Sequence, residues 1–335
     1  MSDKENKSSP AIGLDIGTSR IVAARRNGED YEFQSQLNAF VRVPYSKMTE
    51  KALSKEGVPF SRSNGHLVVH GDESEKFADL LGLETRRPMT AGILNPSEPE
   101  NTEVIQTIVE TVLGREPGES RLLYFSVPAT PIGGSTDHTY HGATLEDVLS
   151  ERGFTVKSID EGLAVIYGEL EENNYTGIGI SCGGGLCNVC LAYLAVPVMS
   201  FAVPKAGDFI DTHAATATGD RATRIRIEKE TSFHFNGSYQ SKVHQALGVY
   251  YDDMIETVIQ TMKEAFAKSR SLPNFKQPIP LVLSGGTALP KGFAERFSKI
   301  LKTKDLPVPL SEIRLAADPL YSTAKGALVA ALAEL

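Results

Sequence analysis

One local pattern occurs twice in this chain, half a chain length apart. Ala11–Arg25 has the order apolar strand, glycine-centred turn and second apolar strand, and Gly177–Tyr193 repeats it. A duplicated unit of this kind predicts two similar α/β halves, each of which begins with its own hairpin. Because ligand pockets occur preferentially between domains, we expect a ligand in a cleft between the two halves.

The spacing of apolar residues predicts the other helices and strands. Thr102–Leu113 and Val243–Phe266 carry apolar residues at helical intervals, which indicates two amphipathic helices that face the core. Leu122–Val127 and Ile279–Ser284 are apolar runs typical of buried strands. The remaining expected elements are a strand at His66–His70, a helix around Ser74–Leu81, a helix near Thr144–Arg152 and an Ala-rich closing helix at Ser322–Leu335.

Composition excludes several classes of protein. The net charge of −8, without a block rich in Lys or Arg, argues against nucleic-acid binding. No apolar run approaches the roughly 20 residues that a membrane span needs. The first ten residues, MSDKENKSSP, are polar and lack the apolar stretch of a signal peptide or a membrane anchor, so we expect a disordered tail on a cytoplasmic protein.

All three cysteines lie in one short stretch. Cys182, Cys187 and Cys190 have a spacing seen in some iron–sulfur proteins, but that cluster needs a fourth cysteine and the chain has none. Zinc would need a histidine as a further ligand, and a strand–turn–strand segment points neighbouring side chains to opposite faces. We therefore interpret the three cysteines as small buried residues in a reducing compartment.

The first hairpin turn has the chemistry of a phosphate-binding loop. Gly17 allows backbone N–H groups to approach an anion, while Thr18 and Ser19 offer hydroxyl donors. Asp15, at the end of the strand, is suited to hold the water shell of a Mg²⁺ ion that bridges phosphates. A second candidate ligand site is Gly285-Gly286-Thr287, where a strand is followed by the start of a helix.

Five motifs follow one another along the chain: Asp15–Thr18, Asp160–Ala164, Gly183–Gly185, Gly207–Asp211 and Ser284–Gly292. Their order is that of the actin, Hsp70 and sugar-kinase superfamily, which the chain resembles over nearly its whole length. It is most similar to the bacterial actin MreB, through Arg87–Leu94, Gly207–Asp211 and Ala317–Leu320 with Ala324–Gly326. The resemblance implies an actin-like α/β fold with two ribonuclease-H-like lobes, each bearing a smaller satellite subdomain, and a cleft between them.

The same reading predicts the division of the chain. We expect the tail over residues 1–10 and the first lobe over 11–158, with its satellite at about 32–89. The second lobe is expected over 159–335, with its satellite at about 212–275.

The resemblance also implies a site for ATP and Mg²⁺ between the lobes. The implied phosphate contacts are Asp15, Gly17, Thr18 and Ser19 in the first lobe and Ser181, Gly183, Gly184 and Gly185 in the second, with Asp15 also nearest the metal. Gly285, Gly286 and Thr287 would lie by the adenine and ribose, and Gly207, Asp208 and Asp211 match the stretch that follows the second hairpin. Glu161 stands where the family positions the attacking water, as the catalytic residue.

Three positions depart from the family pattern. The second phosphate motif normally begins with Asp and ends with Thr, whereas this chain has Ser181 and Leu186. Because phosphoryl transfer depends on electrostatic positioning, these losses predict slow or absent ATP hydrolysis. Gly162 stands where MreB-like chains usually have Pro, which we expect to loosen the presentation of Glu161.

An arginine cluster occupies the region where the family commonly has a helix with a Glu near the ribose. Arg221, Arg224 and Arg226 could bind phosphate or a neighbouring subunit, but we favour a solvated helix face. Because this cluster occupies the region of that Glu, the sequence does not determine the affinity for nucleotide.

The leading hypothesis is an MreB-like cytoskeletal protein of bacterial cell shape that binds ATP, assembles head to tail into filaments and is at most a slow ATPase. One alternative is a non-filamentous nucleotide-sensing scaffold, a pseudo-ATPase. Another is a small-molecule kinase of the same superfamily. The charged loop Gly114–Ser120 and the polar N-terminus argue against direct membrane binding, so attachment would need a protein adaptor.

Overall fold

The computed structural model describes residues 10–98, 100–114, 121–132, 138–239, 241–270 and 272–335. The expected tail, apart from Pro10, and the charged loop, apart from Gly114, lie outside these residues. The chain divides into two compact units, which are described separately. Unit 1 consists of Met1–Val127, Thr139–Ile159 and Ala327–Leu335, and unit 2 of Pro128–His138 and Asp160–Gly326.

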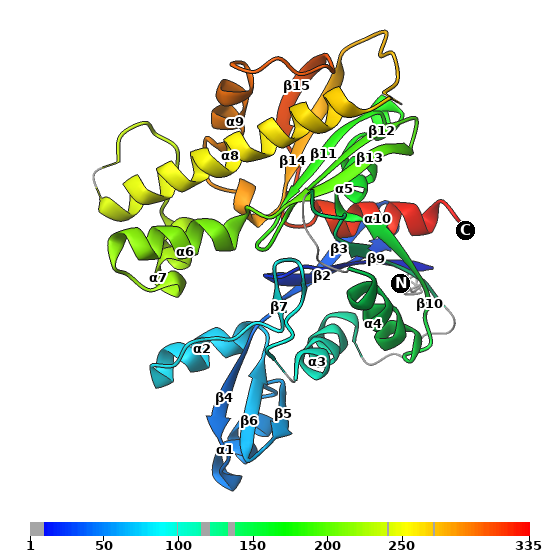
Figure 1. Cartoon of the computed structure of the whole chain (residues 1–335). Helices are drawn as coiled ribbons and strands as arrows, with labels where there is room; N and C mark the ends of the chain where they lie inside the picture. The colour runs from blue at the N-terminus through cyan, green and yellow to red at the C-terminus, as the bar shows by residue number, and fades with distance from the viewer. Residues whose placement is uncertain (1–9, 99, 115–120, 133–137, 240, 271) are drawn as a thin grey trace, which may run out of the picture. The chain divides into compact units, whose positions relative to one another are not determined.

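Unit 1 is built on a five-stranded sheet with the order β10-β9-β1-β2-β3 among its described residues (Figure 1). The strands are β1 (Ala11–Ile16), β2 (Arg20–Asn27), β3 (Asp30–Leu37), β9 (Leu122–Val127) and β10 (Thr155–Asp160). The first hairpin pairs β1 with β2 in antiparallel register, while β9 runs parallel to β1 on its other side. The carboxyl ends of β1 and β9 therefore lie at the same edge of the sheet, and Asp15 is at that edge.

Two helices cover one face of this sheet. Ile12, Leu14 and Ile16 alternate along β1 and point to one side, where they pack with the apolar stripes of α3 (Asn101–Leu113) and α4 (His138–Ser150). Both helices lie on the same side of the sheet in Figure 1. The apolar face of the strand, which repeats every two residues, and the apolar faces of the helices, which repeat every 3.6 residues, thus form one core.

A smaller sheet in unit 1 has the order β4-β6-β5 and its own apolar cluster. Its elements are β4 (Phe40–Pro44), α1 (Lys47–Lys55), β5 (Phe60–Ser63), β6 (His66–His70) and α2 (Asp72–Leu81). The short hairpin of β7 (Met89–Thr90) and β8 (Ile93–Leu94) follows. This satellite begins at Phe40, later than the expected boundary near residue 32, because β3 pairs along its whole length with β2 of the main sheet.

Unit 2 repeats the strand order of unit 1 in its own five-stranded sheet, β13-β12-β11-β14-β15. The strands are β11 (Gly177–Cys182), β12 (Cys187–Tyr193), β13 (Val196–Val203), β14 (Ile279–Ser284) and β15 (Leu310–Leu315). The second hairpin pairs β11 with β12, and β14 runs parallel to β11. The predicted duplication of an α/β unit is confirmed.

The largest core of the protein lies on one face of the second sheet. It is covered by α6 (Gly207–Thr218), α8 (Lys242–Lys268) and α9 (Phe293–Leu301), while α7 (Ala222–Thr231) contacts α6 and α8. Leu247, Tyr251 and Met254 of α8 belong to the same core as the strands. A large part of the segment 212–275, expected as a satellite, is therefore continuous with the main core of unit 2.

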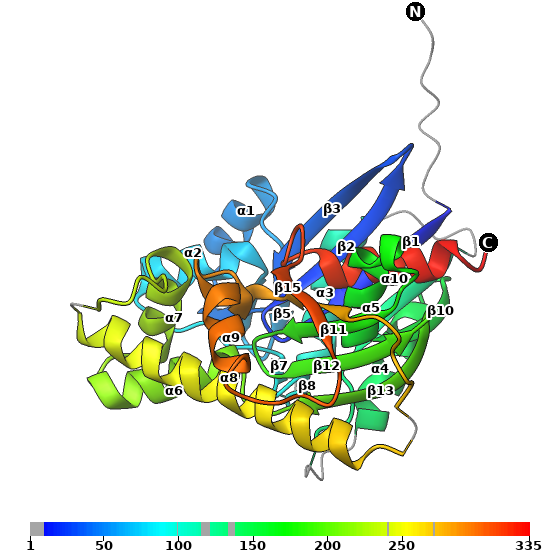
Figure 2. The same cartoon turned by 90° about the horizontal axis from the view of Figure 1, so that it is seen from above.

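Helix α5 (Glu161–Glu169) packs closely between β12 and α10 (Ser322–Leu332) (Figures 1 and 2). A Cβ on Gly162 would lie 2.7 Å from the backbone N of Cys190, and one on Gly326 would lie 1.7 Å from the carbonyl oxygen of Ala164. Glycine is therefore required at both contacts. Gly162, expected to loosen Glu161, instead lets the first turn of α5 press against the sheet.

Among the residues that the structure describes, we find no helix with both the length and the apolarity to cross a membrane.

Candidate functional site

The first hairpin turn, in unit 1, is held from outside by one buried asparagine. The backbone N–H of Gly17 donates to the carbonyl of Arg20 at 2.9 Å and closes the turn. The side-chain amide of Asn38 donates to the Gly17 carbonyl, and its backbone N–H donates to the Ser19 carbonyl, both at 2.9 Å. Two carbonyls that would repel an anion are thereby occupied, while Thr18 is buried in the turn.

Asp15 lies at the end of β1 beside Ser126, at the end of β9. The Ser126 hydroxyl donates to Oδ1 of Asp15 at 2.6 Å. Burial raises the pKa of Asp15 to about 6, because the charged carboxylate is poorly solvated, and the hydrogen bond from Ser126 opposes this effect. A carboxylate with so little solvation is suited to a cation, which would supply the missing stabilisation.

The second hairpin turn, in unit 2, joins three motifs. Gly183 closes the turn by donating its N–H to the carbonyl of Leu186 at 3.0 Å. The Gly183 carbonyl accepts hydrogen bonds from the N–H of Gly207, at 3.1 Å, and from the hydroxyl of Thr287, at 2.7 Å. The Gly184 carbonyl accepts from the N–H of Asp208 at 2.8 Å. The first two N–H groups of α6 therefore hold the turn itself.

Two glycines are needed for this close packing. Gly285 has φ of +91°, and a Cβ there would lie 2.2 Å from the carbonyl oxygen of Cys182. A Cβ on Gly207 would lie 2.6 Å from the hydroxyl oxygen of Thr287. Side chains at these two positions would push Gly285, Gly286 and Thr287 away from the second hairpin.

Asp211 and Lys229 form an ion pair beneath this region. The ammonium of Lys229 lies 2.8 and 2.9 Å from the two carboxylate oxygens of Asp211, and both side chains are buried. A buried pair is costly to break, because the remaining charge would be left without a partner. Asp211, expected beside the nucleotide, thus fixes α7 to α6 and positions the Lys229 side chain as part of a pocket wall.

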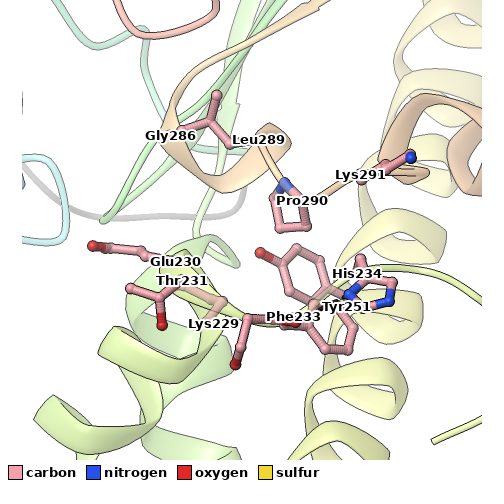
Figure 3. Close-up of a pocket in the computed structure, with 11 residues that line it drawn as sticks. Lys229, Glu230, Thr231, Phe233, His234, Tyr251, Gly286, Leu289, Pro290 and Lys291 are labelled. Carbon is pink, nitrogen blue, oxygen red and sulfur yellow. Dashed lines mark hydrogen bonds between the residues drawn. The ribbon is translucent and has the colours of Figure 1, made fainter.

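A cavity of about 450 Å³ opens between the end of α7 and the loop after β14. Figure 3 shows Glu230 and Thr231 on one side and Leu289 and Pro290 on the other. The lining residues are Lys229, Glu230, Thr231, Ser232, Phe233, His234, Tyr251, Gly286, Leu289, Pro290 and Lys291. Apolar walls with a carboxylate at the rim suit a planar heterocycle that has hydrogen-bond donors.

Glu161 and Ser181 are in direct contact within unit 2. Glu161 is the first residue of α5, and the Ser181 hydroxyl donates to its Oε2 at 2.9 Å. Ser181 is buried at the end of β11, whereas Glu161 is half-buried. The position at which the family pattern has a carboxylate therefore holds a hydrogen-bond donor to the candidate catalytic residue.

Asn188 lies opposite Ser181 in the antiparallel register of the second hairpin. Its Oδ1 accepts a hydrogen bond from the backbone N–H of Ala129 at 2.9 Å. Its Nδ2 is buried and has no hydrogen-bond acceptor within the described part of the chain. An amide donor in this state fits an anion or a water molecule of a bound ligand.

The structure brings the expected residues together in two groups. The group in unit 2 comprises Glu161, Ser181, Gly183, Gly184, Gly185, Gly207, Asp208, Asp211, Gly285, Gly286 and Thr287. The group in unit 1 comprises Asp15, Gly17, Thr18 and Ser19. The donors and acceptors in both groups are the types that hold phosphate, Mg²⁺ and a nucleoside, so the residues present fit ATP.

Sequence reasoning missed four residues of these groups: Asn38, Ser126, Asn188 and Glu230. Ser126 and Asn188 lie within segments expected as strands, whereas no strand or helix is expected at Asn38 or Glu230. The only available signal was that each of the four is a polar residue. The arginine cluster also differs from expectation, since Arg226 is buried and only Arg221 and Arg224 are exposed. Helical spacing explains this, because Arg226 follows the buried Ile225 on the inner side of α7.

The strand order, the paired hairpins and the grouped motifs define an actin-like fold. A family model described as Volactin matches residues 11–331. The chain therefore belongs to the volactin family. None of the curated proteins matches the sequence.

Solved structures with this fold span nearly the whole chain. A MamK double helical filament is similar at 18% identity and a TM-score of 0.71, covering 97% of this chain and 98% of MamK. A non-polymerising MamK mutant bound to AMPPNP is similar at 18% identity and a TM-score of 0.58, over 96% and 98% of the two chains. The ethanolamine utilization protein EutJ from Carboxydothermus hydrogenoformans is similar at 17% identity and a TM-score of 0.54, over 95% and 88%. These similarities confirm the predicted actin-like fold.

Proposed function

We propose that this protein is an MreB-type actin homologue that binds ATP with Mg²⁺, assembles into filaments and hydrolyses ATP slowly. The observation that carries the proposal is the continuity of the unit 2 site. Thr287 bonds to the turn at Gly183, and the residue before it, Gly286, lines the 450 Å³ cavity. A turn suited to phosphates and a pocket suited to a base are thus adjacent, as a nucleoside triphosphate requires.

The first hairpin supports a role for unit 1 in nucleotide binding. The Gly17 N–H closes its turn, and the poorly solvated carboxylate of Asp15 lies at the end of β1 beside Ser126. We propose that this hairpin also binds the phosphates, with Asp15 next to the metal.

Filament formation is proposed by analogy with the MamK filament. A head-to-tail contact uses two different surfaces of one chain and does not close, so it produces open polymers. A chain that sediments as a monomer at high concentration with ATP, with ADP and without nucleotide would exclude this part of the proposal.

The nucleotide-sensing scaffold remains the second candidate, and one observation favours it. Ser181 supplies a hydroxyl to Glu161 where a carboxylate is expected, which leaves Asp15 as the main anionic candidate for the metal. Since electrostatic positioning dominates phosphoryl transfer, we expect this arrangement to bind nucleotide better than it hydrolyses it.

A thermal-denaturation titration tests the proposed site. A ligand present at 100 times its Kd stabilises the folded state by about 2.7 kcal/mol, so millimolar ATP with Mg²⁺ should raise the Tm. Leu289→Trp, which fills the cavity, should reduce this shift, whereas Leu80→Trp, at an exposed position in unit 1, should keep it. Equal shifts in both variants, or no shift in the native protein, would contradict the proposed site.

A further inference from the structure

We propose that Asn188 is a positioning residue that links ligand binding at the second hairpin to the segment where the chain first passes from unit 1 into unit 2. The proposal rests on the proposed nucleotide function. The side-chain oxygen of Asn188 holds the chain at Ala129, and its side-chain nitrogen binds the ligand or a water molecule of the ligand.

The side-chain oxygen of Asn188 is held by a backbone N–H donor. Unit 2 begins at Pro128, which has no N–H, so the first backbone donor after the passage is that of Ala129. Asn188 accepts from this donor at 2.9 Å, and both residues are buried. A flipped side chain would set an NH₂ group against an N–H group, so the amide has only one stable orientation.

The next part of the passage is joined to β13 by backbone hydrogen bonds. The Ala202 N–H donates to the Thr130 carbonyl at 3.0 Å, and the Ile132 N–H donates to the Ala202 carbonyl at 3.1 Å. Pro131, between them, again has no N–H. The side chain of Asn188 adds an attachment at the start of the segment, ahead of these two bonds.

The nitrogen end of Asn188 is buried and finds no acceptor in the ranges that the structure describes. A buried donor without an acceptor is destabilising, so an acceptor from a ligand or its water is strongly favoured there. An amide held at both ends cannot rotate about its Cβ–Cγ bond. Binding at the nitrogen should therefore tighten the bond to Ala129 at the oxygen.

The neighbour of Asn188 across the hairpin extends this link. Ser181 pairs with Asn188 in the register, and its hydroxyl binds Glu161, two residues after the chain leaves unit 1 for the second time at Ile159. The Ser181–Asn188 pair thus contacts Ala129, which follows the first passage from unit 1 into unit 2, and Glu161, which follows the second. The turn that joins its two strands is the candidate phosphate turn, Gly183–Leu186.

Hydrogen exchange at Ala129 tests the proposal, because this N–H reports the bond directly. With the full chain, saturating AMPPNP and Mg²⁺ should slow exchange at Ala129 by about tenfold, which corresponds to about 1.4 kcal/mol. In Asn188→Ala, exchange should be fast and should not respond to AMPPNP. Asn188→Asp keeps the acceptor and should restore slow exchange in the absence of nucleotide, while Asn274→Ala, at an exposed position, should behave as the native protein.

The outcomes separate this proposal from the proposed function. If AMPPNP does not raise the Tm of the native protein, nucleotide binding fails, and the attachment is judged from the nucleotide-free exchange of the Ala and Asp variants. If Asn188→Ala folds and keeps native exchange at Ala129 in both states, the proposal is overturned. If the Ala variant does not fold, a native response to AMPPNP in Asn188→Asp, which lacks the Nδ2 donor, overturns the link.

Discussion

The hydroxyl of Ser181 donates a hydrogen bond of 2.9 Å to the carboxylate of Glu161, and this contact joins the end of β11 to the first residue of α5. The two residues belong to motifs that are 20 positions apart in the chain. Ser181 is buried, so its hydroxyl has little competing water. The bond restrains the side chain of Glu161, which the resemblance to the actin superfamily implies as the catalytic residue.

Removal of this hydroxyl should slow ATP hydrolysis. A hydrogen bond to a charged group contributes about 1.5–3 kcal/mol, so Ser181→Ala should lower single-turnover phosphate release about tenfold while nucleotide affinity changes little. Ser181→Thr, which retains the hydroxyl, should recover part of the rate. Ser311→Ala, at an exposed position in β15, is the control. Equal rates for Ser181→Ala and native protein would show that the bond has no role in hydrolysis.

An aspartate at the same position should make folding depend on a divalent cation. Two carboxylates about 4 Å apart repel by about 4 kcal/mol at an effective dielectric constant of 20. Ser181→Asp should therefore lower the free energy of unfolding by roughly this amount or less in EDTA, and millimolar Mg²⁺ should recover much of the loss. Guanidinium unfolding with and without Mg²⁺ measures both effects. A variant whose stability in EDTA matches that of Ser311→Asp would argue against the close approach of the two side chains.

The adjacent glycines Gly285 and Gly286 should differ sharply in their tolerance of a side chain. Gly285→Ala combines a φ of +91° with a Cβ 2.2 Å from the Cys182 carbonyl oxygen, and we expect a loss of at least about 2 kcal/mol of stability. Gly286→Ala would meet only the Leu320 side chain, at 3.5 Å, an ordinary contact, and should cost less than about 1 kcal/mol. Urea unfolding of the two variants checks the contrast, which similar midpoints would refute.

His70 should make unit 1 sensitive to mild acid. It is buried at the end of β6, and burial lowers its pKa from 6.5 to about 4 against the opposing attraction of Glu100. The unfolded chain therefore binds a proton more readily than the folded chain. Neutral His70 makes its full contribution to the free energy of unfolding above pH 6.5. As the pH falls from 6.5 towards 4, this contribution is lost, and the free energy of unfolding decreases by about 3 kcal/mol in total.

The comparison of two histidine variants isolates this effect. The stability of His70→Gln should fall less steeply between pH 6.5 and 4.5 than that of the native protein, when both are measured by urea unfolding. His66→Gln, at an exposed position on the same strand, should keep the native slope. Parallel curves for His70→Gln and native protein would mean that His70 is not the buried group that titrates.

The local elements could be predicted from sequence because their causes are local. The two hairpins follow from apolar runs interrupted by glycine, and α3 and α8 follow from apolar residues at helical spacing. Their boundaries differ from the predicted ones by at most two residues. The order of the glycine motifs likewise identified the actin-like fold, which the solved structures confirm.

Tertiary structure alone decided which side chains meet. The bond of Asn188 to Ala129 joins residues 59 positions apart, and the pocket joins Glu230 of α7 to Leu289 after β14. No local pattern marks such pairs, because each partner is an ordinary polar or apolar residue in its own segment. Periodicity determined the strands, helices and turns of this protein, whereas the packing of distant segments determined the carboxylate, amide and hydroxyl contacts of its candidate site.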